Sequence, residues 1–105
     1  MPRRAQEFGA PKKWVDDTAG GTWPAGPLKA DSPPGVLYAA EIAKALRKII
    51  DDSGESITAV AEALKVHRST LYGWLDGDVY IDSFSLAAAE AHFQTRLWPD
   101  TIPTT

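Results

Sequence analysis

Residues 56–77, SITAVAEALKVHRSTLYGWLDG, place the strongest constraint on what this chain can fold into. Their apolar residues repeat at helical spacing in two groups, Val60, Ala61 and Leu64 first, then Leu71, Trp74 and Leu75. Val66 lies between the two groups, where a turn is expected. Gly77 follows the second group, at the position of a glycine that ends a helix. The stretch therefore predicts two short helices joined by a tight turn, and the small Ala61 lets them cross closely.

On these residues the stretch resembles the helix-turn-helix of the Cro/phage-repressor (XRE) family, whose motif runs roughly LAxxLGVSxxxIxxWExG. The apolar positions and the closing glycine match. Three positions depart from the motif: Lys65 replaces the turn glycine, His67 replaces the Ser/Thr cap and Leu75 replaces a glutamate. Lys65 is expected in the left-handed conformation, at a cost of roughly 1 kcal/mol. His67 is expected to cap the second helix less well than serine would.

The flanking residues predict two further helices. Residues 36–53 carry an apolar stripe that begins at Ala39 and continues at i+3, i+4, i+7, i+10 and i+11, and Gly54 is expected to end this helix. Asp82 is the expected cap of a helix over residues 83–93. The XRE family shows the same order of helices. We therefore predict an all-α fold, a small bundle of four to five short helices, with the helix-turn-helix domain over 36–99 and a frayed tail over 100–105.

Residues 84–99 carry more apolar surface than one small bundle can bury. The helix over 83–93 has two apolar stripes, one formed by Phe84, Ala87, Ala88 and Ala91 and the other by Leu86, Ala89 and Phe93. Leu97 and Trp98 follow it as an expected apolar anchor. The surplus predicts an interface, either with a second copy of the chain or with another protein.

Residues 1–35 are dense in proline and glycine, so no long helix or strand is expected there. We predict an extended, irregular N-terminal arm. Trp14 and Trp23 are unusual for such an arm, and three interpretations stay open: the tryptophans fold back onto the helices, the arm contacts DNA, or it binds a protein. For DNA, the candidate arm contacts are Arg3, Arg4, Lys12 and Lys13.

The composition argues against several classes of site. The chain has no cysteine, so disulfides and thiolate metal sites are excluded. His67 and His92 lie far apart with no carboxylate pattern, so we predict no metal and no cofactor. No Gly-rich phosphate loop or nucleophile elbow is present, and we do not expect an enzyme. No apolar run approaches the roughly 18 residues of a membrane span. We expect a cytoplasmic protein, associated with the nucleoid when it is bound to DNA.

The net charge of −3 argues against indiscriminate binding to nucleic acid. Residues 1–34 hold five basic and four acidic side chains, whereas residues 35–105 hold six basic and ten acidic ones. An acidic domain binds the phosphate backbone only if its charges are segregated by face. Lys65 and Arg68, which flank the start of the second motif helix, are consistent with such segregation.

The resemblance implies that the outward face of helix 68–76 reads DNA in the major groove. Four residues correspond to base-contacting positions: Arg68, Ser69, Tyr72 and Gly73. Arg68 can pair bidentately with guanine, which gives about 1–3 kcal/mol of discrimination. Tyr72 offers a hydroxyl to phosphate or a ring to a thymine methyl, although a structural tyrosine stays open. A glycine inside a helix costs about 1 kcal/mol. Gly73 is therefore expected either to allow a close approach to DNA or to have no particular role.

Four further residues are candidate phosphate contacts: Thr58, Lys65, His67 and Lys48. Thr58 lies near the start of the first motif helix, where hydroxyls and helix N-termini commonly contact the DNA backbone. A neutral His67 imidazole has two expected roles, as a cap of the second helix or as a phosphate contact that strengthens when the ring is protonated.

These features favour a sequence-specific DNA-binding transcriptional regulator, a small repressor or Cro-like protein of phage, plasmid or bacterial type. The expected partner is double-stranded DNA, and a homodimer is expected because one short helix reads few base pairs. One alternative is an antitoxin or protein-partner-binding module on the same fold, acting through residues 1–35 or 84–99. Another is a DNA-binding component of recombination machinery, because HRSTLYGWL also resembles the recognition helix of resolvase-type and transposase-type domains.

Overall fold

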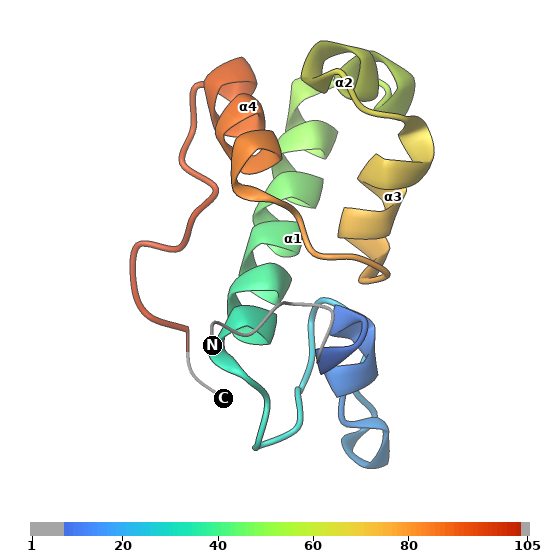
Figure 1. Cartoon of the computed structure of the whole chain (residues 1–105), viewed down its shortest axis with the longest axis vertical. Coiled ribbons are helices and arrows are strands. Elements are labelled where there is room, and N and C mark those ends of the chain that lie inside the picture. Colours follow the sequence, from blue (N-terminus) through green and yellow to red (C-terminus); the bar gives the residue numbers. More distant parts are fainter. Residues whose placement is uncertain (1–7, 104–105) are drawn as a thin grey trace.

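The computed structural model describes residues 8–103, so the candidate arm contacts Arg3 and Arg4 lie outside the described residues. It contains four α-helices, α1 (Pro34–Ser53), α2 (Ile57–Leu64), α3 (Arg68–Asp76) and α4 (Ser83–Phe93) (Figure 1). Two short 3-10 helices, η2 (Pro11–Trp14) and η3 (Asp17–Ala19), precede them. The all-α bundle predicted from the sequence is confirmed.

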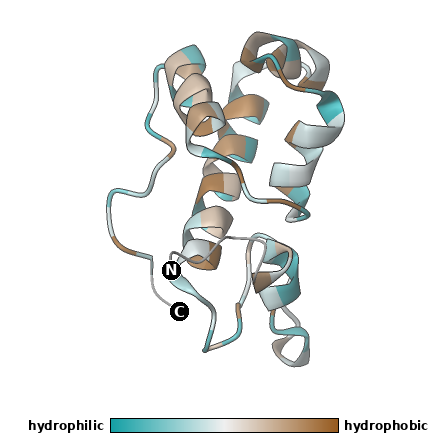
Figure 2. Cartoon of the chain, in the orientation of Figure 1, coloured by the Kyte–Doolittle hydropathy of each residue, from teal (hydrophilic) through white to brown (hydrophobic). Residues whose placement is uncertain are grey.

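The longest helix is α1, with 20 residues. The helix α3 and the segment η2 both pack against α1, and α2 packs against α3 and α4. Figure 2 shows apolar residues along the whole length of α1. Leu46 of α1, Val60 of α2 and Leu71 of α3 are completely or almost completely buried. Burial of such side chains stabilises the fold by about 1.5–3 kcal/mol each.

The core consists of apolar residues from all four α-helices and from the C-terminal segment. Its buried members are Ile42, Leu46, Ile50, Val60, Ala61, Leu64, Leu71, Trp74, Leu75, Leu86, Ala89 and Leu97. Both stripes of residues 56–77 belong to it, so the expected helical phase of α2 and α3 is confirmed.

The helix ends follow local capping chemistry. The side chains of Ser56 and Asp82 accept hydrogen bonds from the backbone N–H groups of Ala59 (3.0 Å) and Ser85 (2.8 Å), as N-caps do. Hydrogen bonds from Ser85 lower the pKa of the Asp82 carboxyl. Gly54, with φ of +73°, ends α1. The helix α1 begins at Pro34, two residues before the expected start, because proline suits the first turn of a helix.

Residues 8–33 are irregular, but they are folded back onto the helices rather than extended away from them. Isolated β-bridges pair Val15 with Leu28 and Thr22 with Gly26. The indole N–H of Trp14 donates to the carbonyl oxygen of Phe8 at 2.9 Å. These contacts give the segment a defined shape without any regular strand in the described part of the chain.

The segment is joined to the end of α3. The backbone N–H of Lys12 donates to the carbonyl oxygen of Gly77 at 3.0 Å, and the Lys12 ammonium pairs with Asp78. The indole of Trp23 lies over Gly77 so closely that a Cβ built on Gly77 would be 2.8 Å from the ring. Three interpretations of the arm tryptophans were open. The one in which they fold back onto the helices holds for Trp23.

The C-terminal segment is held by Glu90 of α4. Its carboxylate accepts hydrogen bonds from the backbone N–H groups of Leu97 (2.7 Å) and Trp98 (3.1 Å), which lower its pKa. Leu97 is buried, as expected of an apolar anchor, and Trp98 stacks on Tyr38 of α1 with 4.6 Å between ring centroids. Within residues 8–103, no helix has the length and apolarity that crossing a bilayer requires.

The contact between Gly77 and Trp23 gives a testable prediction. Gly54 and Gly77 both have φ near +75°, but a Cβ on Gly54 meets nothing within 4 Å. We expect Gly54→Ala to lower the free energy of unfolding by about 1 kcal/mol, the cost of the left-handed backbone alone. Gly77→Ala should cost a further ~1–3 kcal/mol, because its Cβ must displace the Trp23 ring. Urea denaturation of the two variants measures the difference, and equal losses would contradict the docking of residues 8–33.

Candidate nucleic-acid interface

The turn between α2 and α3 fixes the two helices relative to one another. Lys65 adopts the left-handed conformation (φ 60°, ψ 41°), as the sequence predicts, and its backbone N–H bonds to the carbonyl oxygens of Ala61 and Glu62. The N–H of Val66 also donates to Ala61, at 3.0 Å. The turn thus engages two of the last four carbonyls of α2, even though a lysine stands where glycine is usual.

The helix α3 divides cleanly into an inner and an outer face. Leu71, Trp74 and Leu75 are buried against the rest of the domain. Arg68 and Ser69 in the first turn are exposed, and Tyr72 in the next turn has 43% of its surface exposed. Three of the four candidate base-contacting side chains therefore share the outer face of α3.

Gly73 differs from the other three, because it is buried. A Cβ built on it would be 2.9 Å from Cγ2 of Val79, a residue of the loop that follows α3. The missing side chain of Gly73 thus makes room for this loop. The packing explains the glycine without any approach of DNA, and we remove Gly73 from the candidate base contacts.

Ion pairs engage most of the basic side chains in the described part of the chain. The pairs are Lys12–Asp78, Lys44–Glu41, Arg47–Asp76, Lys48–Asp52 and Arg96–Asp100. Lys29 interacts electrostatically with the Asp16 carboxylate. The cations left without an acidic partner among residues 8–103 are Lys13, Lys65 and Arg68. Two of these three, Lys65 and Arg68, lie at the turn and at the start of α3.

The ion pairs divide the candidate phosphate and arm contacts into lysines that have an acidic partner and lysines that have none. Lys48 binds Asp52 of the same helix at 2.9 Å, and this pair raises its pKa. Lys12 is held by Asp78, so Lys48 and Lys12 reach phosphate only by leaving a partner, whereas Lys65 and Lys13 are free in the described structure. Thr58 is exposed in the first turn of α2.

The expected capping role of His67 is not present. His67 has the extended backbone of an N-cap (φ −73°, ψ 151°), but its imidazole makes no capping hydrogen bond. Ser56 has nearly the same backbone geometry (φ −75°, ψ 158°), and its hydroxyl does cap α2. The imidazole of His67 is exposed, which leaves a phosphate contact as its remaining predicted role.

Val79 is a surface residue of this region that the sequence analysis did not single out. It is 47% exposed although it packs on Gly73. The signal that points to it is indirect: a glycine inside a predicted helix requires a neighbour that occupies the space, and the loop after α3 supplies one.

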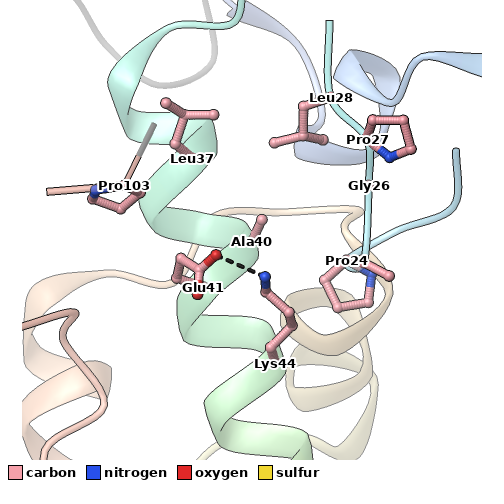
Figure 3. Close-up of a pocket in the computed structure, with 10 residues that line it drawn as sticks. Pro24, Gly26, Pro27, Leu28, Leu37, Ala40, Glu41, Lys44 and Pro103 are labelled. Carbon is pink, nitrogen blue, oxygen red and sulfur yellow. Dashed lines mark ion pairs between the residues drawn. The ribbon is translucent and has the colours of Figure 1, made fainter. Parts of the chain in front are cut away.

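A shallow cavity of about 220 Å³ lies elsewhere, between residues 24–28, α1 and Pro103 (Figure 3). Its charged groups, Glu41 and Lys44, pair with each other at 2.7 Å. In the described residues, no group of His, Cys, Asp and Glu side chains is arranged to hold a metal ion. The cavity therefore offers neither a free acid–base pair nor a metal ligand set.

The empty cap of α3 gives a second prediction. We expect His67→Ser to raise the free energy of unfolding by about 0.5–1 kcal/mol, because a serine hydroxyl in this geometry can accept the N–H of Ser69, while the N–H of Thr70 donates to the carbonyl oxygen of residue 67. Ser56→Ala is the matched control, and it should cost about 1 kcal/mol. Thermal or urea unfolding measures both. A His67→Ser variant less stable than the wild type would mean that the imidazole stabilises α3 by another contact.

The part of the chain with this geometry resembles a known protein family. Residues 38–77, which cover most of α1 and all of α2 and α3, match the family model of a homeodomain-like domain. No curated protein and no solved structure gives a significant match to the chain. The match agrees with the observed turn and the two-faced α3, and it does not single out the Cro/phage-repressor family. Residues 38–77 therefore fold as a helix-turn-helix and are similar to a homeodomain-like domain, a type of domain that binds DNA.

Proposed function

We propose that the chain is a sequence-specific DNA-binding transcriptional regulator that inserts α3 into the major groove. The observation that carries this proposal is the placement of the two free cations Lys65 and Arg68 at the N-terminal end of α3. Recognition helices contact base edges mainly through their N-terminal residues. A helix-turn-helix that occupies an operator can act as a repressor without further chemistry.

The charges along α3 favour this orientation. Its first turn carries Arg68, whereas its last residue is the acidic Asp76, which pairs with Arg47 of α1 at 3.8 Å. A phosphate is attracted to the first end, whereas the cations at the second end, Lys12 and Arg47, are engaged in ion pairs. The acidic net charge of the chain is thus compatible with a basic contact region, because the acidic groups at the far end of α3 are already paired.

Each contact has a defined role in the proposal. The Arg68 guanidinium pairs with guanine O6 and N7, and Ser69 and Tyr72 contact neighbouring base edges or phosphate. Lys65, Thr58 and His67 bind phosphates and set the register of the protein on the duplex. A regulator of this kind acts in the cytoplasm, on the nucleoid.

The exposed face of α4 supports a homodimer. Phe84 is 88% exposed, and Ala87 and Ala91 are exposed at i+3 and i+7 from it. The two titratable residues of α4 are engaged within the chain, Glu90 by the backbone of Leu97 and Trp98, and His92 by Glu55 at 3.0 Å. An apolar helix face without free charge suits a self-complementary contact, since no like charges meet there.

Selection of bound duplexes from a random DNA pool tests the proposal. We expect the wild type to enrich an inverted repeat with half-sites about one helical turn apart. Arg68→Ala should lose preference at one base pair of each half-site, a loss of about 5- to 150-fold in discrimination. Lys29→Ala removes a cation outside the helix-turn-helix and should keep the same motif. Absence of any enriched sequence at low salt would contradict the proposed function.

The dimer has its own test. Phe84→Gln should shift the protein from dimer to monomer in sedimentation velocity without lowering its unfolding temperature, because the ring is exposed in the single chain. Ile102→Gln is the matched control, since Ile102 is 78% exposed but lies outside α4, and it should leave the dimer intact. A wild type that stays monomeric at tens of micromolar protein would contradict the dimer. It would direct the α4 face to a different protein, as in the antitoxin-like alternative.

A further inference from the structure

The loop after α3 is fixed to the recognition helix. The backbone N–H groups of Asp78 and Val79 both donate to the carbonyl oxygen of Gly73, at 2.9 and 3.2 Å. The Asp78 carboxylate binds Lys12, which ties the same loop to η2. Figure 1 shows the loop leaving the end of α3 on its way to α4. Val79 therefore has a set position relative to α3.

That position borders the proposed base-reading face. Gly73 follows Tyr72 directly and lies four residues after Ser69, so on a helix its flank adjoins both side chains. Val79 fills this flank, with its Cγ2 atom 2.9 Å from where a Cβ on Gly73 would lie. Nearly half of the Val79 surface stays open to solvent at the same time. One side of the isopropyl group thus packs on α3, and the other side is available for a contact.

We propose that Val79 contacts the methyl group of a thymine and so reads a T·A pair beside the bases read by α3. The inference rests on the proposed function, because it assumes that α3 enters the major groove. In that groove the C5-methyl of thymine is the apolar feature of the base edges, and aliphatic side chains recognise it by contact. A valine has no donor or acceptor in its side chain, so it selects thymine by burial of a methyl group.

The proposed contact of Val79 requires a glycine at position 73. A side chain at position 73 would occupy the flank and push Val79 outward or away. The chain thus replaces a helix residue on the reading surface with a loop residue six positions later. This exchange accounts for both an interior helix glycine and a half-exposed valine.

Replacement of thymine by deoxyuridine tests the inference, because it removes the methyl group and leaves the hydrogen-bonding edge unchanged. The selected duplex is prepared with each thymine replaced in turn, and binding is measured by fluorescence anisotropy. For the wild type we expect one position per half-site to weaken binding about fourfold, the value of one buried methyl group. Val79→Ala should bind the two duplexes equally at that position, and thermal unfolding checks that it is folded.

Tyr72→Ser is the matched variant, because the Tyr72 ring is the competing reader of a thymine methyl on the same face. It should keep the deoxyuridine effect at the Val79 position. Loss of the effect in Tyr72→Ser but not in Val79→Ala would overturn the inference, as would a wild type indifferent to every replacement. In both of these cases duplex binding persists and the proposed function stands. Failure to bind any duplex would overturn both.

Discussion

The burial of Leu71, Trp74 and Leu75 determines what the rest of the surface can do. These side chains commit one face of α3 to the core, so the helical repeat leaves Arg68, Ser69 and Tyr72 no place except the opposite face. The composition of the outer face is therefore a consequence of core packing. Because the inner face is buried, the unpaired Arg68 lies on the outer face, close in sequence to Lys65 in the turn before α3. A rotation of α3 by one residue would bury the polar groups and expose the apolar ones, at a cost of several kcal/mol.

Gly77 is the second constraint, because three parts of the chain meet there. Its left-handed backbone ends α3, its carbonyl oxygen accepts the N–H of Lys12, and its bare Cα receives the Trp23 indole. The docking of residues 8–33 therefore depends on the way α3 ends. This arrangement supports the C-terminal half of α3, while the first turn of α3, with the unpaired Arg68, stays exposed.

The sequence predicted the features that local chemistry decides. The sequence predicts that α3 begins at Arg68 and ends at Asp76 and that Asp82 caps α4, and the structure has the same bounds. These bounds are predictable because capping and apolar spacing act within one or two helical turns. The folded shape of residues 8–33 was not predictable in this way, since Lys12 and Asp78 are far apart in the chain and the density of proline and glycine only indicates a loop. The role of Gly73 was missed for the same reason: its neighbour Val79 comes close only when the loop folds back.

The interior glycine of α3 shows how such long-range packing outweighs propensity. Glycine in mid-helix costs about 1 kcal/mol relative to alanine, and α3 is too short to be stable alone. Its carbonyl oxygen accepts two loop N–H groups, and its flank accepts a valine, so the loss is offset by contacts that alanine would obstruct. The same contacts hold Val79 of the loop against Gly73, on the flank of α3. Gly73→Ala would stabilise α3 as an isolated helix, but it would separate the loop from the helix and narrow the surface that we propose to contact DNA.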